Sequence, residues 1–212
     1  MRCLIVDYGH GGMVDGEYQT PGGKQYHFTD QQPTLDIYEG VTNRMTAAAL
    51  MNEAISAGCP VWDCVADKRR TSPVYWTELE QTDVSLSARV RHANKHRLGL
   101  LVSCHSNAVG NSIYGGSQPP HGVEVYTSRG DTGADPVADT LAQSFKANLN
   151  ELRWRGIQEA GFYILRKTTM PAVLGEVGFF TNISDARFLL DEDSHVKIAQ
   201  AYWLGVRQWL DF

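Results

Sequence analysis

Two histidines and two glutamates in this chain stand where an apolar segment ends or a helical pattern begins. They are His10, Glu39, His105 and Glu176. Two histidines and one carboxylate, with a fourth position open for water, form one of the recurring ligand shells of catalytic zinc. A second glutamate nearby can take a proton from such a water and pass it to a leaving group. These residue types therefore indicate metal-assisted hydrolysis.

Each of the four residues also has an ordinary structural explanation. His105, in LVSCHSNA, fits a core histidine with one hydrogen bond, and His10, in DYGHGG, fits a turn. Glu39 fits a carboxylate that the dipole of a helix places at its first turn, and Glu176 fits a paired structural acid. Only their joint placement favours a site. The other histidines lack such a placement and are predicted to be loop or surface residues: His27, His92, His96, His121 and His195.

Apolar segments of strand length alternate with helical patterns along the chain. The predicted strands cover residues 3–8, 61–66, 98–104, 123–128, 162–167 and 172–179, and the predicted helices cover 39–57, 84–96, 136–149 and a final helix from about residue 195. Apolar strands of this kind are covered on both faces. The alternation predicts an α/β fold with a mainly parallel, twisted sheet and helices on both faces. We find no repeat or linker and predict a single domain over residues 1–212.

The carboxyl ends of the strands in such a sheet form the edge where ligands bind. His10 and His105 each follow a predicted strand, Glu176 lies late in another, and Glu39 begins the first predicted helix on the same side. We therefore expect the four to converge at this edge. Two long loops, 11–38 and 109–121, have no predicted structure of their own, and such loops are usually functional or mobile.

Composition excludes several other classes of protein. The formal net charge of −5 over 212 residues argues against nucleic-acid binding, and no apolar run approaches the length of a membrane span. The start, MRCLIVDYGHGG, lacks the apolar core of a secretory signal, so we expect either synthesis without an export signal or a trimmed chain. None of the four cysteines has CxxC spacing, which favours reduced, buried thiols over disulfides or a cysteine zinc site.

Several segments together resemble one enzyme family. They are DYGHGG at 7–12, YEGVTNR at 38–44, VSLSARVRHANK at 84–95, VSCHSNA at 102–108, GVEVYTS at 122–128, RGIQEAGFYILRKTTMPAVLGEVGFFTN at 155–182, and the final helix. In this order they resemble the zinc-dependent N-acetylmuramoyl-L-alanine amidases, which include bacterial cell-separation amidases and phage endolysins. The family often has proline where this chain has Tyr8, and region 11–38 is longer than in many relatives. Neither difference falls on a ligand position.

The resemblance implies a role for each of the four residues. His10, Glu39 and His105 would bind one Zn²⁺ per chain, and Glu176 would be the catalytic glutamate. The substrate would be peptidoglycan, cut between N-acetylmuramic acid and L-alanine in an open groove. We expect a monomer that binds neither nucleic acid nor membrane.

Residues beside these four could assist them or serve packing alone. Ser103, Asn107 and Asp7 could orient a ligand or contact substrate, and packing or turn formation explains them equally well. Arg89 and Arg166 could meet a substrate carboxylate, although an ordinary surface salt bridge is the better prediction for each.

The biological setting has alternatives. A phage or prophage endolysin, held in the host cytoplasm until it reaches the cell wall, fits the absence of an export signal. A trimmed bacterial cell-separation amidase is the runner-up. A zinc peptidase acting within the stem peptide and an inactive wall-binding module are also open, although the complete set of four residues argues against the module.

Overall fold

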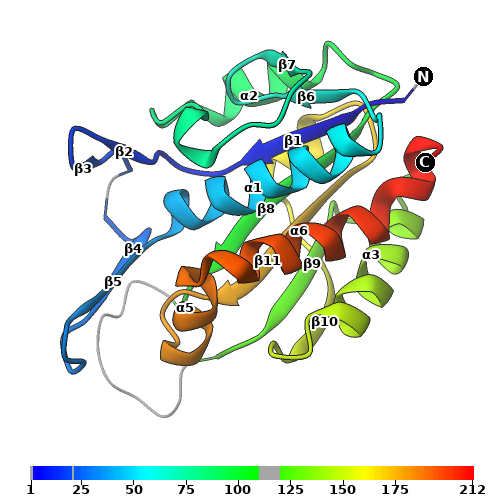
Figure 1. The fold of residues 1–212 in the computed structure, drawn as a ribbon. Coiled ribbons are helices and arrows are strands. Elements are labelled where there is room, and N and C mark those ends of the chain that lie inside the picture. The colour runs from blue at the N-terminus through cyan, green and yellow to red at the C-terminus, as the bar shows by residue number, and fades with distance from the viewer. Residues whose placement is uncertain (1, 21, 110–119) are drawn as a thin grey trace.

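The computed structural model describes residues 2–20, 22–109 and 120–212, which form a twisted seven-stranded sheet with helices on both faces (Figure 1). The strands are β1 (Leu4–Tyr8), β6 (Val61–Asp63), β7 (Lys68–Arg70), β8 (Leu100–Asn107), β9 (Val123–Thr127), β10 (Trp154–Glu159) and β11 (Ala172–Phe179). Their order across the sheet is β10-β9-β11-β8-β1-β6-β7. The pairs β9–β11 and β6–β7 are antiparallel, and the other neighbouring pairs are parallel. The predicted α/β class with a mainly parallel sheet is confirmed.

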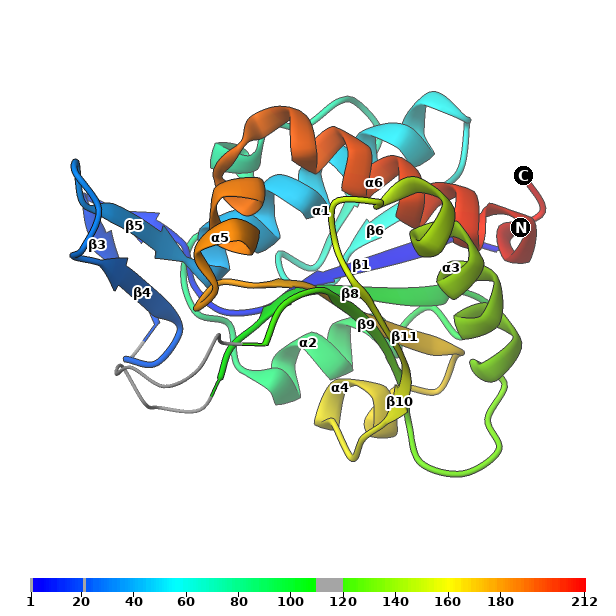
Figure 2. The ribbon, with the colours of Figure 1, turned by 90° about the horizontal axis from the view of Figure 1, so that it is seen from below.

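The two faces of the sheet are covered unequally, as Figure 2 shows. One face packs against α1 (Glu39–Ser56), α3 (Asp135–Asn148), α5 (Ile183–Leu190) and α6 (Glu192–Val206) around the larger apolar core. The other face carries the short helices α2 (Leu86–Ala93) and α4 (Tyr163–Lys167) and a smaller core. Two short 3-10 helices complete the described helical elements, η1 (Trp76–Glu78) and η2 (Arg207–Leu210).

The predicted strand at 162–167 is wrong, because this segment forms α4. Its consecutive residues Ile164 and Leu165 are both buried in the smaller core. Such a pair fits a strand covered on both faces as well as a helical turn, so the apolar pattern alone does not separate the two. The edge strand is β10, whose residues are all half-buried or exposed and therefore show no apolar alternation. Helix α5 and the edge strand β7 were also not predicted.

Several predicted boundaries shift for local reasons. The predicted strand 61–66 stops at Asp63, because the Asp63 carboxylate accepts hydrogen bonds from the amides of Val65 and Ala66 and closes a turn. Helix α2 begins after Ser85, whose hydroxyl accepts a hydrogen bond from the Ala88 amide. Strand β8 continues to Asn107, so His105 lies within the strand rather than after it. The final helix begins at Glu192.

Region 11–38, predicted as a loop without structure, contains two hairpins. They pair β2 (Met13–Val14) with β3 (Glu17–Tyr18), and β4 (Gln25–Phe28) with β5 (Leu35–Tyr38). The first turn is Asp15-Gly16, and both residues have positive φ, as a two-residue hairpin turn requires. The hairpins lie at the end of the sheet opposite both termini (Figure 1, Figure 2). Most of the other predicted loop, 109–121, lies outside the described residues.

The cysteine and membrane predictions can be compared directly with the structure. Cys59, Cys64 and Cys104 are buried, Cys3 is half-buried, and all are free thiols, as expected. Among the described residues, no helix is both long enough and apolar enough to span a bilayer.

Candidate metal and acid–base site

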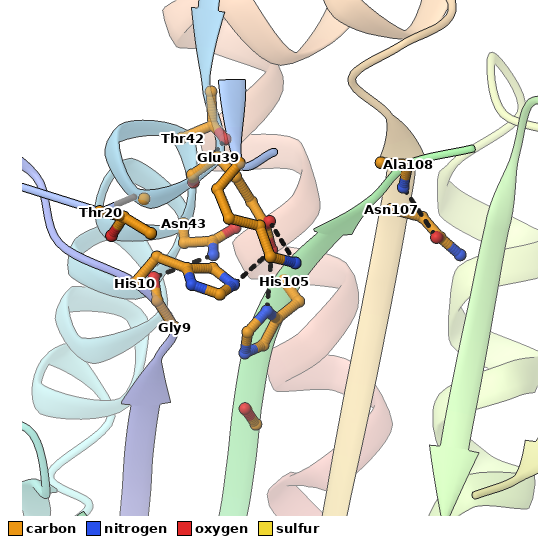
Figure 3. A network of polar contacts seen from close by, with 12 residues as sticks. Gly9, His10, Thr20, Glu39, Thr42, Asn43, His105, Asn107 and Ala108 are labelled. Atoms are coloured by element: carbon orange, nitrogen blue, oxygen red, sulfur yellow. Dashed lines mark hydrogen bonds and ion pairs between the residues drawn. The ribbon is translucent and has the colours of Figure 1, made fainter. Parts of the chain in front are cut away.

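Three side chains with metal-binding atoms meet beyond the carboxyl end of β1 and beside that of β8 (Figure 3). The Glu39 Oε1 atom lies 3.3 Å from His10 Nε2 and 2.9 Å from His105 Nδ1. The two imidazole rings are perpendicular, with centroids 5.3 Å apart. One ligand atom from each residue lies within 4.8 Å of the others. The structure therefore brings His10, Glu39 and His105 together as a compact group of donors suited to one metal ion.

Backbone geometry places the two histidines. His10 has a φ of 68°, in the left-handed region, which non-glycine residues seldom adopt and which recurs at functional sites. Gly9 lies against the His105 ring so closely that a Cβ atom at Gly9 would be 1.9 Å from Cε1 of the imidazole. The absence of a side chain at position 9 is thus what lets the His105 ring lie beside the β1 end.

Helix α1 holds the His10 turn from the other side. Arg44 is fully buried, and its Nη1 donates to the carbonyl oxygens of His10 at 2.9 Å and Gly40 at 2.7 Å. Asn43 Nδ2 donates to the Gly9 carbonyl at 3.2 Å. Because Glu39 begins the same helix, these bonds fix the turn that carries one imidazole relative to the carboxylate.

The carboxylate of Glu39 has two different surroundings. Oε1 faces both imidazoles, whereas the buried Oε2 has no hydrogen-bond partner among the described residues and lies 3.2 Å from the Lys24 ammonium. The Lys24 carbonyl accepts hydrogen bonds from the Glu39 amide at 2.9 Å and the Tyr18 hydroxyl at 3.0 Å. The segment that connects the two hairpins of region 11–38 therefore supplies a cation to this site.

The charges of the group suit metal binding. Burial raises the pKa of the Glu39 carboxyl, but hydrogen bonds and charges from His10 and His105 outweigh burial and hold that pKa well below its ordinary value. Burial lowers the pKa of His10, and the neighbouring Glu39 only partly offsets this. Glu39 is therefore ionised and His10 neutral near pH 7, which are the protonation states that metal ligands need.

Glu176 lies on β11, next to this group in the sheet. In the strand registers it is paired with His105 of β8 on one side and with Glu124 of β9 on the other. Its Oε2 is buried and has no hydrogen-bond partner among the described residues. Burial, and then the negative charges of Glu39 and Glu124, raise the pKa of Glu176 well above its ordinary value. A glutamate held in this way can carry a proton near neutral pH.

Two of the weaker candidates form a buried pair beneath the histidines. Arg89 Nη1 donates to Asp7 Oδ1 at 2.8 Å, and Ser103 Oγ donates to Asp7 Oδ2 at 2.6 Å. Arg89 is only 5 % exposed, so the predicted surface salt bridge is in fact internal. Burial raises the pKa of Asp7, but Arg89, His105 and Ser103 together lower it below the ordinary value. The set is a structural ion pair that also places a negative charge near His105.

The remaining candidates lie away from the ligand group. Arg166 lies over the Tyr163 ring, 5.8 Å from its centroid, and forms no ion pair with a described acid. Asn107 Nδ2 donates to Glu124 Oε2 at 3.0 Å. His195 is 3 % exposed, so its assignment as a loop or surface residue is wrong. Its Nε2 donates to the Leu189 carbonyl at 2.8 Å, so it is a satisfied core histidine.

The other histidines lie outside the site. His27 pairs with Asp36 at 2.7 Å on the exposed hairpin, and His121 is exposed. His92 and His96 are partly covered, the first by a hydrogen bond to the Cys64 carbonyl and the second by the Trp62 ring.

Sequence reasoning missed a second polar group beside Glu176. Glu124 is 5 % exposed and accepts hydrogen bonds from Asn107, Tyr126 and Arg155. A carboxylate at an alternate position of the apolar segment VEVYT was the available signal, because a buried charge requires partners.

Comparison with known proteins gives one family. The family model for N-acetylmuramoyl-L-alanine amidase matches residues 65–208. The amidase LytC of Bacillus subtilis (strain 168) is 28 % identical over 202 residues, which cover 94 % of this chain and 34 % of LytC. The chain thus spans about a third of the length of this relative.

Two solved structures match over nearly their whole length. The catalytic domain of the amidase CwlV from Bacillus (Paenibacillus) polymyxa var. colistinus has a TM-score of 0.76 at 25 % identity, covering 100 % of this chain and 99 % of that one. The amidase from Clostridium difficile 630 has a TM-score of 0.75 at 27 % identity, covering 99 % and 97 % respectively.

Proposed function

Because this chain belongs to the N-acetylmuramoyl-L-alanine amidase family, we propose that it hydrolyses the amide bond between N-acetylmuramic acid and L-alanine in peptidoglycan. The arrangement of side chains at the candidate site supports this proposal on chemical grounds. A compact group of His10, Glu39 and His105 lies one strand away from Glu176, a buried glutamate whose Oε2 has no hydrogen-bond partner among the described residues.

The donor set fits a single zinc ion. His10, Glu39 and His105 would hold it, since two imidazoles and one carboxylate leave a coordination position open for substrate or water. Zinc held there would supply Lewis-acid polarisation of the amide carbonyl and a lowered pKa for water. Arg44, Asn43 and Lys24 would keep the His10 turn and the Glu39 carboxylate in place for this purpose.

Glu176 would handle the proton. Its carboxylate takes a proton from the attacking water and returns it to the amide nitrogen as the C–N bond breaks. The products are a free carboxyl group on the lactyl side and a free amino group on L-alanine. The raised pKa of Glu176 favours the second transfer, because the protonated form is then accessible near neutral pH.

Analysis of the products tests this function. Purified peptidoglycan digested by the chain should gain free L-alanine amino groups and no new reducing sugar ends. New reducing ends would mean a glycosidase, and amino groups on other stem residues would mean a peptidase. No new ends at all, from folded and zinc-loaded protein, would favour a wall-binding module.

The biological setting is a separate proposal. An endolysin would stay in the host cytoplasm and lyse the cell only when a co-expressed pore opens the inner membrane, acting as a monomer on the wall without nucleic acid or membrane insertion. The bacterial origin of relatives such as LytC supports a bacterial wall amidase as the second candidate. Expression inside a bacterium with and without such a pore separates the two.

A further inference from the structure

A buried carboxylate next to Glu176 holds an arginine that is partly open to solvent. Glu124 Oε1 accepts a hydrogen bond from Arg155 Nε at 2.8 Å, and Oε2 accepts from Asn107 at 3.0 Å and from the Tyr126 hydroxyl at 2.9 Å. The Arg155 side chain is 29 % exposed, and its guanidinium lies 5.0 Å from the centroid of the Phe179 ring. The hydrogen bond from Nε to Glu124, which is itself held by Asn107 and Tyr126, therefore fixes the position of the Arg155 side chain.

This arginine lies at the end of a row of polar residues that crosses the sheet. His105, Glu176 and Glu124 are paired in register on β8, β11 and β9, so their side chains point to the same face. Arg155 comes from β10, the next strand, and reaches back to Glu124. Neighbouring strands are about 4.8 Å apart. The row therefore begins at His105 of the candidate metal site and continues through Glu176 and Glu124. It ends at the guanidinium group of Arg155.

The proposed function requires a stem peptide that extends away from the cleaved bond on the side of its nitrogen. In the proposed reaction the carbonyl of the cleaved bond would lie at His10, Glu39 and His105, and its nitrogen would lie at Glu176, which returns the proton. A leaving peptide that follows the row past Glu176 would run toward β9 and β10. In peptidoglycan the residue after L-alanine is D-glutamate, joined through its γ-carboxyl group, so that its α-carboxylate is free. One residue spans about 3.5 Å of extended chain, which brings this carboxylate toward Arg155.

We propose that Arg155, held by Glu124, binds the free α-carboxylate of the second stem residue and so determines which stem peptides the enzyme prefers. This inference rests on the proposed amidase function. An arginine forms short, charge-assisted hydrogen bonds with a carboxylate, and with Nε committed to Glu124 its terminal nitrogens are the donors available for one. Many cell walls carry D-isoglutamine at this position, where the carboxylate is replaced by an uncharged amide. The subsite therefore discriminates between two natural forms of the same substrate.

The test compares the two forms as ligands and as substrates. The peptides L-Ala-γ-D-Glu-L-Lys and L-Ala-γ-D-isoGln-L-Lys are titrated onto the zinc-loaded chain by calorimetry, and matched muropeptides are assayed for KM and kcat. The carboxylate form should bind about tenfold more tightly, the lower end of the range for charged hydrogen bonds because Arg155 is partly solvated. The preference should appear in KM. This comparison uses the parent protein alone, so the result does not depend on whether a variant folds.

Arg155→Gln should abolish the preference, and Arg155→Lys should restore part of it. Arg153→Gln is the matched control, because Arg153 is an exposed arginine two residues away and should leave the preference unchanged. Equal binding of both peptides by the parent, no measurable binding of either, or an unchanged preference in Arg155→Gln would overturn the proposal. A failure of the amidase function itself would appear differently, as peptidoglycan without new L-alanine amino groups while the binding preference is still measured.

Discussion

Substitution of Gly9 by alanine should displace the proposed metal ligand His105, although none of the ligand residues is itself changed. A Cβ atom at this position would lie 1.9 Å from Cε1, 2.3 Å from Nε2 and 2.8 Å from Nδ1 of His105, whereas ordinary contacts begin near 3.4 Å. The imidazole must therefore move by about 1.5 Å. Distances in metal sites tolerate only about 0.2 Å, so in Gly9→Ala the His105 nitrogen no longer reaches a position shared with His10 and Glu39.

The expected loss of zinc affinity is large. Changes in groups that merely orient a ligand cost about 10- to 100-fold in metal affinity, so displacement of a ligand should cost more than about 100-fold. The affinity is measured by competition with a chromophoric chelator, and the metal content by elemental analysis. Gly133→Ala is the control, because its added Cβ would meet only Pro171 at an ordinary 3.7 Å.

Folding must be followed separately, because the overlap could also loosen the end of β1. Circular dichroism and thermal unfolding in excess chelator compare the metal-free forms of the parent and Gly9→Ala. A Gly9→Ala protein that folds normally and binds zinc within about tenfold of the parent would refute the reasoning. It would mean that His105 does not bind the metal or that the β1 end yields easily.

Two further changes give distinct outcomes. Glu176→Gln should lower kcat by about 10⁴-fold or more, the upper end for general acid–base catalysis, and should leave the zinc content unchanged. Activity within about tenfold of the parent would contradict the assignment. Loss of zinc together with activity would make Glu176 a metal ligand. Burial lowers the pKa of His195 from 6.5 to about 4, so protonation favours the unfolded chain and the free energy of unfolding should fall as the pH drops from about 6.5 to 4, by up to about 3 kcal/mol. Denaturant titrations of metal-free parent and His195→Gln should show this part of the pH slope only in the parent, and equal slopes would contradict it.

The convergence of the four principal residues could be predicted because it depends on a simple rule of α/β sheets. Strands that read as continuous apolar segments were found at 3–8 and 172–179, close to the observed β1 and β11. Once such strands are parallel, their carboxyl ends meet, and residues at those ends become neighbours whatever their separation in sequence. The same rule says nothing about which atoms of Glu39 face the histidines.

The group around Glu124 could not be predicted because its elements carry weak sequence signals. Strand β10 is an edge strand without a buried face, and its pairing with β9 shifts register between Trp154 and Gly156, so its pattern has neither apolar runs nor alternation. Segment 162–167, by contrast, has aromatic and aliphatic residues typical of a strand, although it forms α4. Without β10 next to β9, the sequence offers no reason to place Arg155 beside Glu124.

Region 11–38 contributes directly to the candidate site through hydrogen bonds and one charge. Thr20 Oγ1 accepts a hydrogen bond from the Gly11 amide at 2.6 Å, directly after His10, and the Tyr18 hydroxyl accepts one from the Gly40 amide at 3.0 Å, directly after Glu39. Lys24 then faces the oxygen of Glu39 that the histidines leave free. Region 11–38 thus contacts the chain next to His10 and next to Glu39, and it neutralises part of the charge of Glu39. Tyr18, Thr20 and Lys24 therefore help to hold two of the proposed metal ligands in place.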